Sequence, residues 1–303
     1  MIVNRTNLNF IKTKILPWAL AGRPKTLPAA LAPVIIGTAM AFADQRGHWI
    51  SAIFAALAAL FIQIATNYAN DYYDFVKGSD KAERLGPTRA TAAGWVSPHA
   101  MKRAFIIVFA LAALCGIYLF IRAGWPVLVI GVFSIAAGIL YTGGPYPIGY
   151  HGLGDLFVFF FFGLVAVGGT YYVQTLHMNA PVILAGVAPG LFSTAILTVN
   201  NLRDIENDKH SGKRTLPVLL GSRMGWLEYV LCIIAAGLTP LFLILLTKTH
   251  YWTAMASLIL IAAIPSIRLI YTQPPSKRYN NVLAATGQLL FGYSILFALG
   301  WLL

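Results

Sequence analysis

Most of the carboxylates in this sequence lie in two short windows, residues 71–83 and residues 204–208. The chain has only ten acidic residues, and seven of them fall in these two windows. An amide residue precedes each window, and carboxylates follow it about one and two helical turns later: Asn67, Asp71 and Asp74 for the first acidic window, and Asn200, Asp204 and Asp208 for the second. In a helix, these spacings predict that each trio shares one face. The repeated pattern indicates a weak internal duplication.

Carboxylates grouped in this way predict a site for a hard divalent cation. Like charges one turn apart destabilise a helix, and a charged side chain in a bilayer costs up to about 2.5–3.5 kcal/mol, so a bound cation would offset both costs. Mg²⁺ prefers carboxylate oxygens and commonly bridges them to substrate phosphates. Neither window contains the His or Cys of a zinc site. We therefore predict that the two windows face each other and hold a diphosphate through Mg²⁺. The alternative is that they are interfacial caps and solvated loops.

The acidic windows stand at the ends of long apolar runs. The sequence is 58% hydrophobic and 11% charged, whereas soluble domains are about 25% charged. Runs of about the 20 residues needed to cross a bilayer recur along the chain. They predict an all-α, polytopic membrane protein with about nine transmembrane helices in one bundle: 27–42, 50–74, 103–121, 125–142, 154–175, 180–202, 226–247, 251–271 and 283–302. Both cysteines, Cys115 and Cys232, fall inside these spans and are expected to be small apolar residues.

The basic residues predict the orientation of the bundle. If the N-terminus is cytoplasmic and nine spans alternate, 19 of the 22 Lys and Arg residues lie on the cytoplasmic side, and only Arg46, Arg122 and Lys248 lie on the other. This distribution obeys the positive-inside rule and supports the count of nine. The net charge of +12 is thus explained by topology and by an anionic ligand at the cytoplasmic face, and it requires no nucleic-acid partner.

Basic and aromatic residues near the windows are candidates for binding a lipid diphosphate. Seven basic residues share the predicted cytoplasmic face with the carboxylates: Lys77, Lys81, Arg84, Arg89, Lys209, Lys213 and Arg214. We prefer Lys209 and Arg89 as diphosphate contacts, and the alternative for each is a loop charge that only sets topology. If the lipid is allylic, its departing carbon becomes a cation that aromatic faces can stabilise. Tyr141 and Tyr72 are the preferred tyrosines for that role.

Two sequence motifs resemble those of a known family. "NDYYDFVKGSD" at 70–80 and "NNLRDIENDKHSGKRTL" at 200–216 resemble the two aspartate-rich motifs of the UbiA-type intramembrane prenyltransferases. Segments 22–39, 78–90, 141–163 and 203–221 are similar to the branch of that family that prenylates 1,4-dihydroxy-2-naphthoate. The resemblance covers nearly the whole chain, and the set of motifs in this order is more specific than any one of them.

The resemblance implies a fold, a reaction and a set of site residues. It implies nine transmembrane helices around a central cavity, forming one domain over 1–303 with a cytoplasmic N-terminal segment at 1–20, in the cytoplasmic (inner) membrane. A polyprenyl diphosphate would ionise, the naphthoate ring would attack the allylic carbon, and CO₂ would leave, giving demethylmenaquinone. The implied ligands of Mg²⁺ are Asn67, Asp71, Asp74, Asp80, Asp204 and Asp208, with Asn67 and Asn200 also near the substrate. Many family members have a third Asp at the position of Gly78, so a direct contact of Asp80 with metal stays open.

Two further residues could recognise the aromatic acceptor. Arg23, in "GRPKTLP", could bind the naphthoate carboxylate with bidentate geometry, or it could be one more basic residue that sets topology. Asp155, in "GYHGLGDLF", could be a helix N-cap, a base, or a group that positions a ring hydroxyl. His151 nearby is expected to be a loop residue.

Other functions compete with this interpretation. Within the same class, the acceptor could be hydroxybenzoate, homogentisate or a tetrapyrrole, with unchanged metal chemistry. From a different class, a cation- or proton-coupled transporter could also place acids in a membrane. Against the transporter, the carboxylates cluster at one predicted membrane face and not at mid-depth.

Overall fold

The structure is a computed structural model that describes residues 15–79 and 85–303, and this part of the chain is helical, without strands. The longer helices are α3 (Pro28–Ala43), α4 (Trp49–Val76), α5 (Pro98–Ala123), α6 (Trp125–Leu140), α9 (Ala180–Arg203), α12 (Ser222–Thr247), α13 (Ile259–Thr272) and α14 (Tyr279–Leu302). The shorter ones are α2 (Leu16–Ala21), η2 (Pro24–Thr26), η3 (Ile148–Tyr150), α7 (Gly154–Phe159), η4 (Phe160–Val165), α8 (Ala166–Thr175), α10 (Ile205–His210), α11 (Leu216–Leu220) and η5 (Tyr251–Leu258).

Local sequence signals set the helix ends. Ser97 caps α5 by accepting a hydrogen bond from the backbone N–H of Ala100, and Pro98 follows at the first helical position, where its missing N–H is tolerated. The helix ends at Gly124, whose φ of 76° belongs to the left-handed region that favours glycine. The chain then turns directly into α6.

Each of the nine predicted spans corresponds to a helix or a continuous helix pair. Seven segments of the described chain are long and apolar enough to cross a membrane: α4, α5, α7 to α8, α9, α12, η5 to α13, and α14. An eighth is a pair, Leu16–Thr26 with Pro28–Ala43, bent by 52°. The remaining predicted span is the apolar α6, which has only 16 residues. The prediction of an all-α, multi-pass membrane protein is confirmed, and the count of nine is approximate because α6 is short and the first span is bent.

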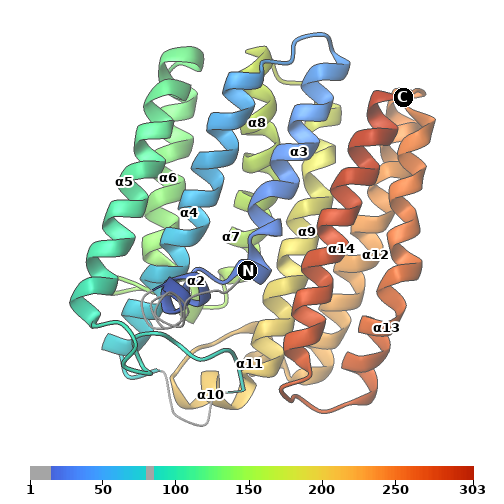
Figure 1. Ribbon diagram of the computed structural model, residues 1–303. Helices are drawn as coiled ribbons and strands as arrows, with labels where there is room; N and C mark the ends of the chain where they lie inside the picture. Colours follow the sequence, from blue (N-terminus) through green and yellow to red (C-terminus); the bar gives the residue numbers. More distant parts are fainter. Residues whose placement is uncertain (1–14, 80–84) are drawn as a thin grey trace, which may run out of the picture.

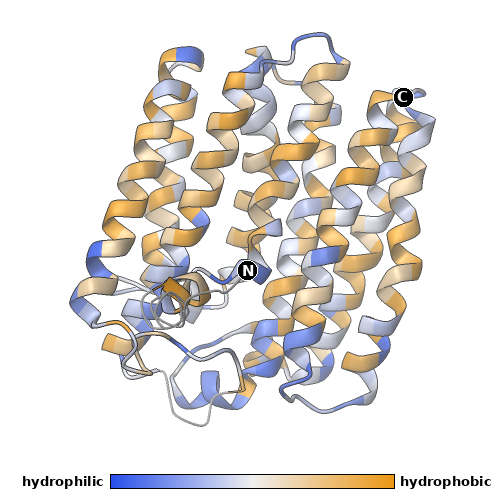
Figure 2. Ribbon diagram, in the orientation of Figure 1, coloured by the Kyte–Doolittle hydropathy of each residue, from blue (hydrophilic) through white to orange (hydrophobic). Residues whose placement is uncertain are grey.

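The helices stand side by side, and the longer loops lie at one end of the bundle (Figure 1). Helices α4, α5 and α6 lie on one side of the bundle, α9 and α12 to α14 lie on the other, and α3 and α8 lie between them (Figure 1). The hydrophobic residues dominate along the helix bodies, whereas hydrophilic residues concentrate at the end that carries α10 and α11 (Figure 2). Helix α2 lies at this same end and the C-terminus at the opposite one (Figure 1). An odd number of crossings follows, as nine spans require.

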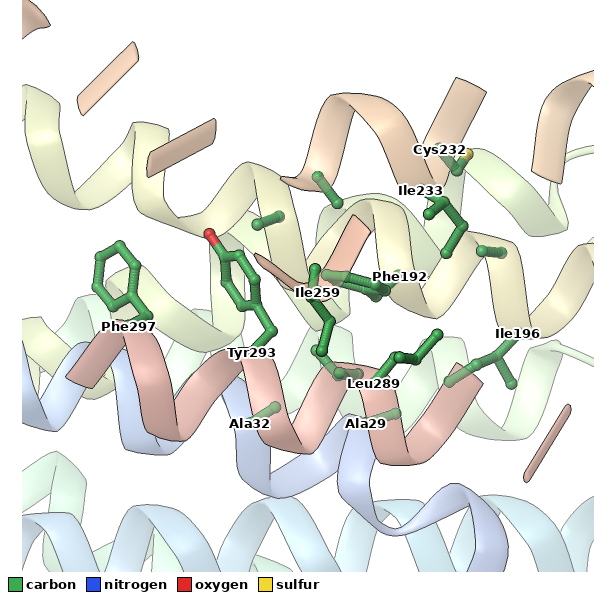
Figure 3. Close-up of a cluster of buried hydrophobic side chains, with 14 of the residues drawn as sticks. Ala29, Ala32, Phe192, Ile196, Cys232, Ile233, Ile259, Leu289, Tyr293 and Phe297 are labelled. Atoms are coloured by element: carbon green, nitrogen blue, oxygen red, sulfur yellow. The ribbon is translucent and has the colours of Figure 1, made fainter. Parts of the chain in front are cut away.

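Helix α9, which carries the second acidic window at its end, packs against η4 on one side and against α14 on another. Where α9 crosses η4, a Cβ added to Gly163 would lie 2.5 Å from the backbone oxygen of Gly186, so only glycine allows this close approach. On its other side the Phe192 ring packs against Tyr293 of α14, with ring centroids 5.4 Å apart, inside the apolar cluster of Figure 3. The backbone that leads into residues 200–208 is therefore held rigidly.

Candidate functional site: a carboxylate cavity joined to an apolar cavity

Carboxylates of both acidic windows line one polar cavity of about 180 Å³. Asp74 comes from the last turns of α4, and Asp204 and Asp208 come from the end of α9 and from α10. Lys213 links the windows, because its Nζ lies 3.4 Å from Oδ1 of Asp74 and 3.9 Å from Oδ1 of Asp208. The structure thus brings together two windows that are more than a hundred residues apart in the sequence, as their shared pattern predicts.

The residues of the first motif differ in whether they line the cavity. Asn67 lines the cavity and donates through Nδ2 to the carbonyl of Gly22 at 2.9 Å, which ties α4 to the chain before η2. Asp71 is buried, and it is absent from the residues that line the cavity. Its two carboxylate oxygens accept the backbone N–H groups of Ala90 and Thr91, both at 2.9 Å. Asp71 therefore holds a loop in this structure, which differs from the ligand position predicted for it.

Asn70 is a cavity residue that the sequence reasoning did not select. It is buried, it lines the cavity, and its Oδ1 accepts a hydrogen bond from the hydroxyl of Thr142 at 2.8 Å. Asn70 and Asp74 have the same i, i+4 spacing as Asn200 and Asp204. This shared spacing is visible in the sequence. It pairs Asn70 with Asn200, whereas the alignment described above pairs Asn67, three residues earlier, with Asn200.

Arg89 completes the first window. Its Nη2 lies 2.7 Å from Oδ2 of Asp74, and both side chains are buried at the cavity wall. The loop that carries Arg89 is the loop whose amides Asp71 accepts. Arg89, which we prefer as a diphosphate contact, therefore lies at the cavity wall beside Asp74.

The second window is organised by Arg203, another residue that the sequence reasoning did not select. Its side chain is 1% exposed and forms a bidentate pair with Asp204, with Nε to Oδ1 at 2.8 Å and Nη2 to Oδ2 at 2.5 Å. Nη2 also donates to Oδ1 of Asn200 at 2.7 Å. Asn200 and Asp204 line the cavity, whereas Arg203 lies behind them. A buried guanidinium with this many acceptors fixes the direction of its carboxylate partner.

Tyr150, in the glycine-rich loop that follows α6, contacts the first window and Lys213. Its hydroxyl lies 2.8 Å from Oγ of Ser79 and donates to Oδ1 of Asp74 at 3.3 Å. The ammonium groups of Lys77 and Lys213 each lie 4.9 Å from its ring centroid. Burial raises the pKa of Tyr150 above its ordinary value, with the Asp74 charge adding to the effect, so the phenol stays protonated and remains a donor.

The predicted basic residues occupy different places. Lys77 donates to the carbonyl of Thr142 at 2.6 Å and lies outside the cavity lining, and burial lowers the pKa of its ammonium. Lys209 is exposed and also lies outside the lining. Lys213, which we had not preferred, is the lysine that contacts both windows. Asp80 and Lys81 lie outside the described residues.

A second, larger cavity of about 410 Å³ lies next to the carboxylates and is almost entirely apolar. Residues of α3, α4, α5, α6 and α7 to α8 form its wall. Six residues line both cavities, so the polar space is continuous with the apolar one: Ala29, Gln63, Thr66, Tyr141, Val158 and Phe162. The predicted Tyr141 therefore stands at the junction between the polar cavity and the apolar cavity.

The remaining predicted residues lie around this junction or away from it. Arg23 lines the polar cavity and has a left-handed backbone, with φ of 52°, a conformation that costs energy in a residue other than glycine. Asp155 is in the first turn of α7 without capping it, lies outside both linings, and has one buried carboxylate oxygen without a hydrogen bond. Tyr72 packs against Tyr73 and Phe105, outside both cavities.

The donor set of the polar cavity suits a hard cation that the substrate helps to coordinate. Asp74, Asp204 and Asp208 offer oxygen ligands, and no Cys or His lines this cavity. Among the described residues, no three acidic, His or Cys side chains converge closely enough to hold a metal ion alone. Mg²⁺ is typically bound by one or two carboxylates together with waters and substrate phosphates, so the residues present fit Mg²⁺ as part of a complex with a phosphorylated substrate.

A polar cavity with carboxylates and basic groups is thus joined to an apolar cavity inside a bundle of helices that are long and apolar enough to cross a membrane. The chain belongs to the UbiA prenyltransferase family, whose family model matches residues 30–302.

Two relatives are similar over most of their length. A 1,4-dihydroxy-2-naphthoate octaprenyltransferase of Haemophilus influenzae is 37% identical over 97% of this chain and 98% of its own. The protein of the same name from Escherichia coli is 42% identical over 77% of each chain.

Solved structures share the fold at low sequence identity. A UbiA homologue from Archaeoglobus fulgidus bound to DMAPP and Mg²⁺ is 14% identical and superposes with a TM-score of 0.65 over 92% of this chain and 98% of the other. The apo UbiA homologue from Aeropyrum pernix K1 is 17% identical, with a TM-score of 0.67 over 92% of this chain and 97% of the other.

Proposed function

We propose that this protein transfers a polyprenyl group from a polyprenyl diphosphate to 1,4-dihydroxy-2-naphthoate. The prenyl carbon forms a bond to the ring, diphosphate and CO₂ leave, and the product is demethylmenaquinone in its reduced form. The observation that carries the proposal is the continuity of the carboxylate cavity with the apolar cavity. The names of the Haemophilus and Escherichia relatives support the choice of acceptor.

The polar cavity would bind the diphosphate head. Arg89 and Lys213 stand at the cavity wall beside Asp74, where they can also reach phosphate oxygens. Asp74, Asp204 and Asp208, together with the amide oxygens of Asn70 and Asn200, are the proposed ligands of Mg²⁺. When bound, Mg²⁺ would neutralise negative charge that develops on the departing diphosphate. Structures of relatives with Mg²⁺ and prenyl diphosphates support this assignment.

The apolar cavity would hold the prenyl chain and keep water from the reacting carbon. Tyr141 is one of the aromatic residues at the junction of the two cavities, where the allylic carbon would lie. Its ring face can stabilise the positive charge that forms as the diphosphate departs. Phe162, which also lines both cavities, extends the same apolar wall. Exclusion of water protects the cation until the ring attacks.

The acceptor would enter beside Arg23. This residue lines the polar cavity and can pair with the naphthoate carboxylate, holding the ring with its reacting carbon toward Tyr141. Asp155 lies one residue from Gly154, where an added Cβ would be 3.0 Å from the Tyr141 hydroxyl. Because Asp155 lines neither cavity, its proposed role is indirect: it would help to position Tyr141 through the turn at Gly154.

The membrane orientation belongs to the same proposal. We infer that residues 1–303 form one prenyltransferase domain in the cytoplasmic (inner) membrane, with the N-terminus and the end that carries α10 facing the cytoplasm. The excess of Lys and Arg in the loops of that end supports this orientation. A water-soluble naphthoate would then reach the polar cavity from the cytoplasm, and the prenyl diphosphate would reach the apolar cavity from the bilayer.

The test is a product assay with competing acceptors. Purified protein in detergent is incubated with farnesyl diphosphate, Mg²⁺ and either 1,4-dihydroxy-2-naphthoate, 4-hydroxybenzoate or homogentisate, and products are identified by mass spectrometry. Of the three acceptors, we expect only 1,4-dihydroxy-2-naphthoate to give a prenylated and decarboxylated product. Product from one of the other two acceptors would replace the acceptor that we propose, and no product from any of them would reject prenyl transfer.

Removal of the Tyr150 hydroxyl is expected to lower prenyl transfer moderately, because this hydroxyl donates to Asp74. A hydrogen bond to a charged group contributes about 1.5–3 kcal/mol, so Tyr150→Phe should lower kcat/KM for the prenyl diphosphate by about ten- to a hundred-fold. Tyr146→Phe is the matched control, because Tyr146 lies in the same loop, is exposed and lines neither cavity. Steady-state assays of both variants compare their kcat/KM values for the prenyl diphosphate. Equal activity in the two variants would show that the Tyr150 hydroxyl does not support Asp74.

A further inference from the structure

Residues 85–91, which we name the strap, are tied to the bundle at three points. The carbonyl of Leu85 accepts Nδ2 of Asn280 at 3.0 Å, and the backbone N–H groups of Ala90 and Thr91 donate to Asp71. The third tie is the pair of Arg89 with Asp74. Two ties therefore lead to α4 and one leads to α14. The strap lies at the end of the bundle that carries α10 (Figure 1).

Asn280 connects the strap to the second acidic window. It is the second residue of α14, and its two side-chain polar atoms face different partners. Nδ2 donates to Leu85, whereas Oδ1 accepts from Nη1 of Arg203 at 2.7 Å. Arg203 in turn grips Asp204 and Asn200. One side chain thus joins the segment that carries Arg89 to the arginine that directs Asp204.

We propose that Asn280 is a positioning residue for the prenyl diphosphate. It does not line the cavity, and it acts by fixing the strap and Arg203 relative to each other. Arg89 and Asp204 then face the same head group from opposite windows. The identity of the ligand rests on the proposed function, whereas the connection itself rests on the contacts of Asn280.

The physical reason lies in the burial of Arg203. A buried guanidinium needs an acceptor for each of its N–H groups, because an unsatisfied buried donor carries a desolvation penalty. Without the Asn280 oxygen, Nη1 loses its acceptor and the direction of the Arg203 fork is no longer fixed from the α14 side. Loss of the Asn280 amide also releases Leu85, at the start of the strap. Both changes loosen groups that face the diphosphate, and neither reaches Arg23 beside the acceptor.

Three variants separate these contacts. Asn280→Ala removes both hydrogen bonds. Asn280→Asp keeps an acceptor for Arg203 and replaces the donor to the Leu85 carbonyl with a carboxylate oxygen. Asn281→Ala is the matched control, because Asn281 is the same residue type one position later on α14 and is exposed.

The experiment compares direct binding with kinetics in the full-length, detergent-purified protein. Calorimetry measures the affinity for farnesyl thiolodiphosphate, an unreactive analogue, in the presence of Mg²⁺. Steady-state assays measure KM for farnesyl diphosphate and for the naphthoate, and thermal unfolding gives Tm. Relative to Asn281→Ala, we expect Asn280→Ala to weaken analogue binding and raise KM for farnesyl diphosphate by about ten-fold. We expect KM for the naphthoate to stay unchanged and Tm to fall, because Nη1 of the buried Arg203 loses its acceptor. The analogue affinity of Asn280→Asp and its KM for farnesyl diphosphate should lie between those of Asn280→Ala and Asn281→Ala.

Two results would overturn the proposal. Analogue affinity of Asn280→Ala equal to that of Asn281→Ala would show that the link does not serve the head group. A rise in KM for the naphthoate as large as the rise in KM for farnesyl diphosphate would show a purely structural role. If the unaltered protein binds the analogue but transfers no prenyl group to the naphthoate, the proposed function fails while the binding comparison still decides the role of Asn280. Failure of the unaltered protein to bind the analogue would reject both.

Discussion

Prenyl transfer by this protein is expected to stop when EDTA removes the divalent cation. A phosphate oxygen held about 4 Å from a carboxylate is repelled by about 4 kcal/mol at an effective dielectric constant of about 20. Because about 1.4 kcal/mol corresponds to ten-fold in rate, one such uncompensated contact lowers the rate by about a thousand-fold. Mass spectrometry of product formed in EDTA, and after Mg²⁺ is restored in excess, measures this loss and its reversal.

The basic residues of the site cannot replace the cation. Arg89, Arg203 and Lys213 already pair with the carboxylates of the two windows. These three positive charges balance Asp74, Asp204 and Asp208. Arg23 adds a fourth positive charge at the cavity wall, so an incoming diphosphate still brings more negative charge than the site compensates. Ca²⁺ is the matched control, because it is an oxygen-preferring cation with longer bonds and a looser geometry than Mg²⁺. Full turnover in EDTA, with metal content verified as negligible, would contradict the assignment of the carboxylates as metal ligands.

The fold could be predicted from the sequence because the membrane imposes a simple rule. A span needs about 20 apolar residues with satisfied backbone hydrogen bonds, so the runs at 50–74 and 180–202 could be assigned to helices without tertiary information. Structure was needed for the limits of this rule. Helix α6 has only 16 residues, and the first span contains a 52° bend near Pro24 and Pro28, where proline interrupts the helix.

The site could be predicted only as far as local spacing reaches. The two windows were recognisable because an amide and carboxylates recur one turn apart. Helical spacing alone, however, cannot distinguish Asp71 from Asn70, because both lie near the face that Asp74 defines. The distinction depends on Ala90 and Thr91, whose amides cover Asp71, and these lie 19 and 20 residues further along the chain.

Long-range partners explain the residues that sequence reasoning did not select. Arg203 meets Asn280 across 77 residues, and Tyr150 meets Asp74 across 76. Such contacts leave no periodic pattern in the sequence. In the sequence, an arginine at the end of a span cannot be told from a loop arginine that only sets membrane topology. Its burial and its pairing in the structure show that Arg203 directs Asp204. Lys209 and Lys213 likewise could not be separated by composition, since both follow the second window.

Asp74→Asn and Asp71→Asn are expected to have very different effects, although both replace a buried carboxylate on the same turn of α4. Asp74 lines the cavity and contacts Arg89 and Lys213, so its neutralisation removes a proposed metal ligand and weakens the ion pair with each of these two basic groups. We expect Asp74→Asn to lower kcat/KM by about a thousand-fold or more, since loss of one partner of a buried ion pair costs about 3–5 kcal/mol. The affinity for Mn²⁺, measured by electron paramagnetic resonance with farnesyl thiolodiphosphate present, should fall with it.

Asp71→Asn should instead loosen the strap while leaving metal affinity intact. In the variant, the amide oxygen can accept the backbone N–H of Ala90 or that of Thr91, but not both. The NH₂ group then faces the other backbone N–H, which is left without an acceptor. An unsatisfied buried donor costs about 1–3 kcal/mol, so we expect a lower Tm and a loss of about ten- to a hundred-fold in kcat/KM as Arg89 becomes less ordered. Mn²⁺ affinity should stay close to that of the unaltered protein. If Asp71→Asn weakened Mn²⁺ binding as strongly as Asp74→Asn, Asp71 would be a metal ligand, as its spacing from Asn67 first predicted, and its contacts with the strap would have to be exchanged for the metal when substrate binds.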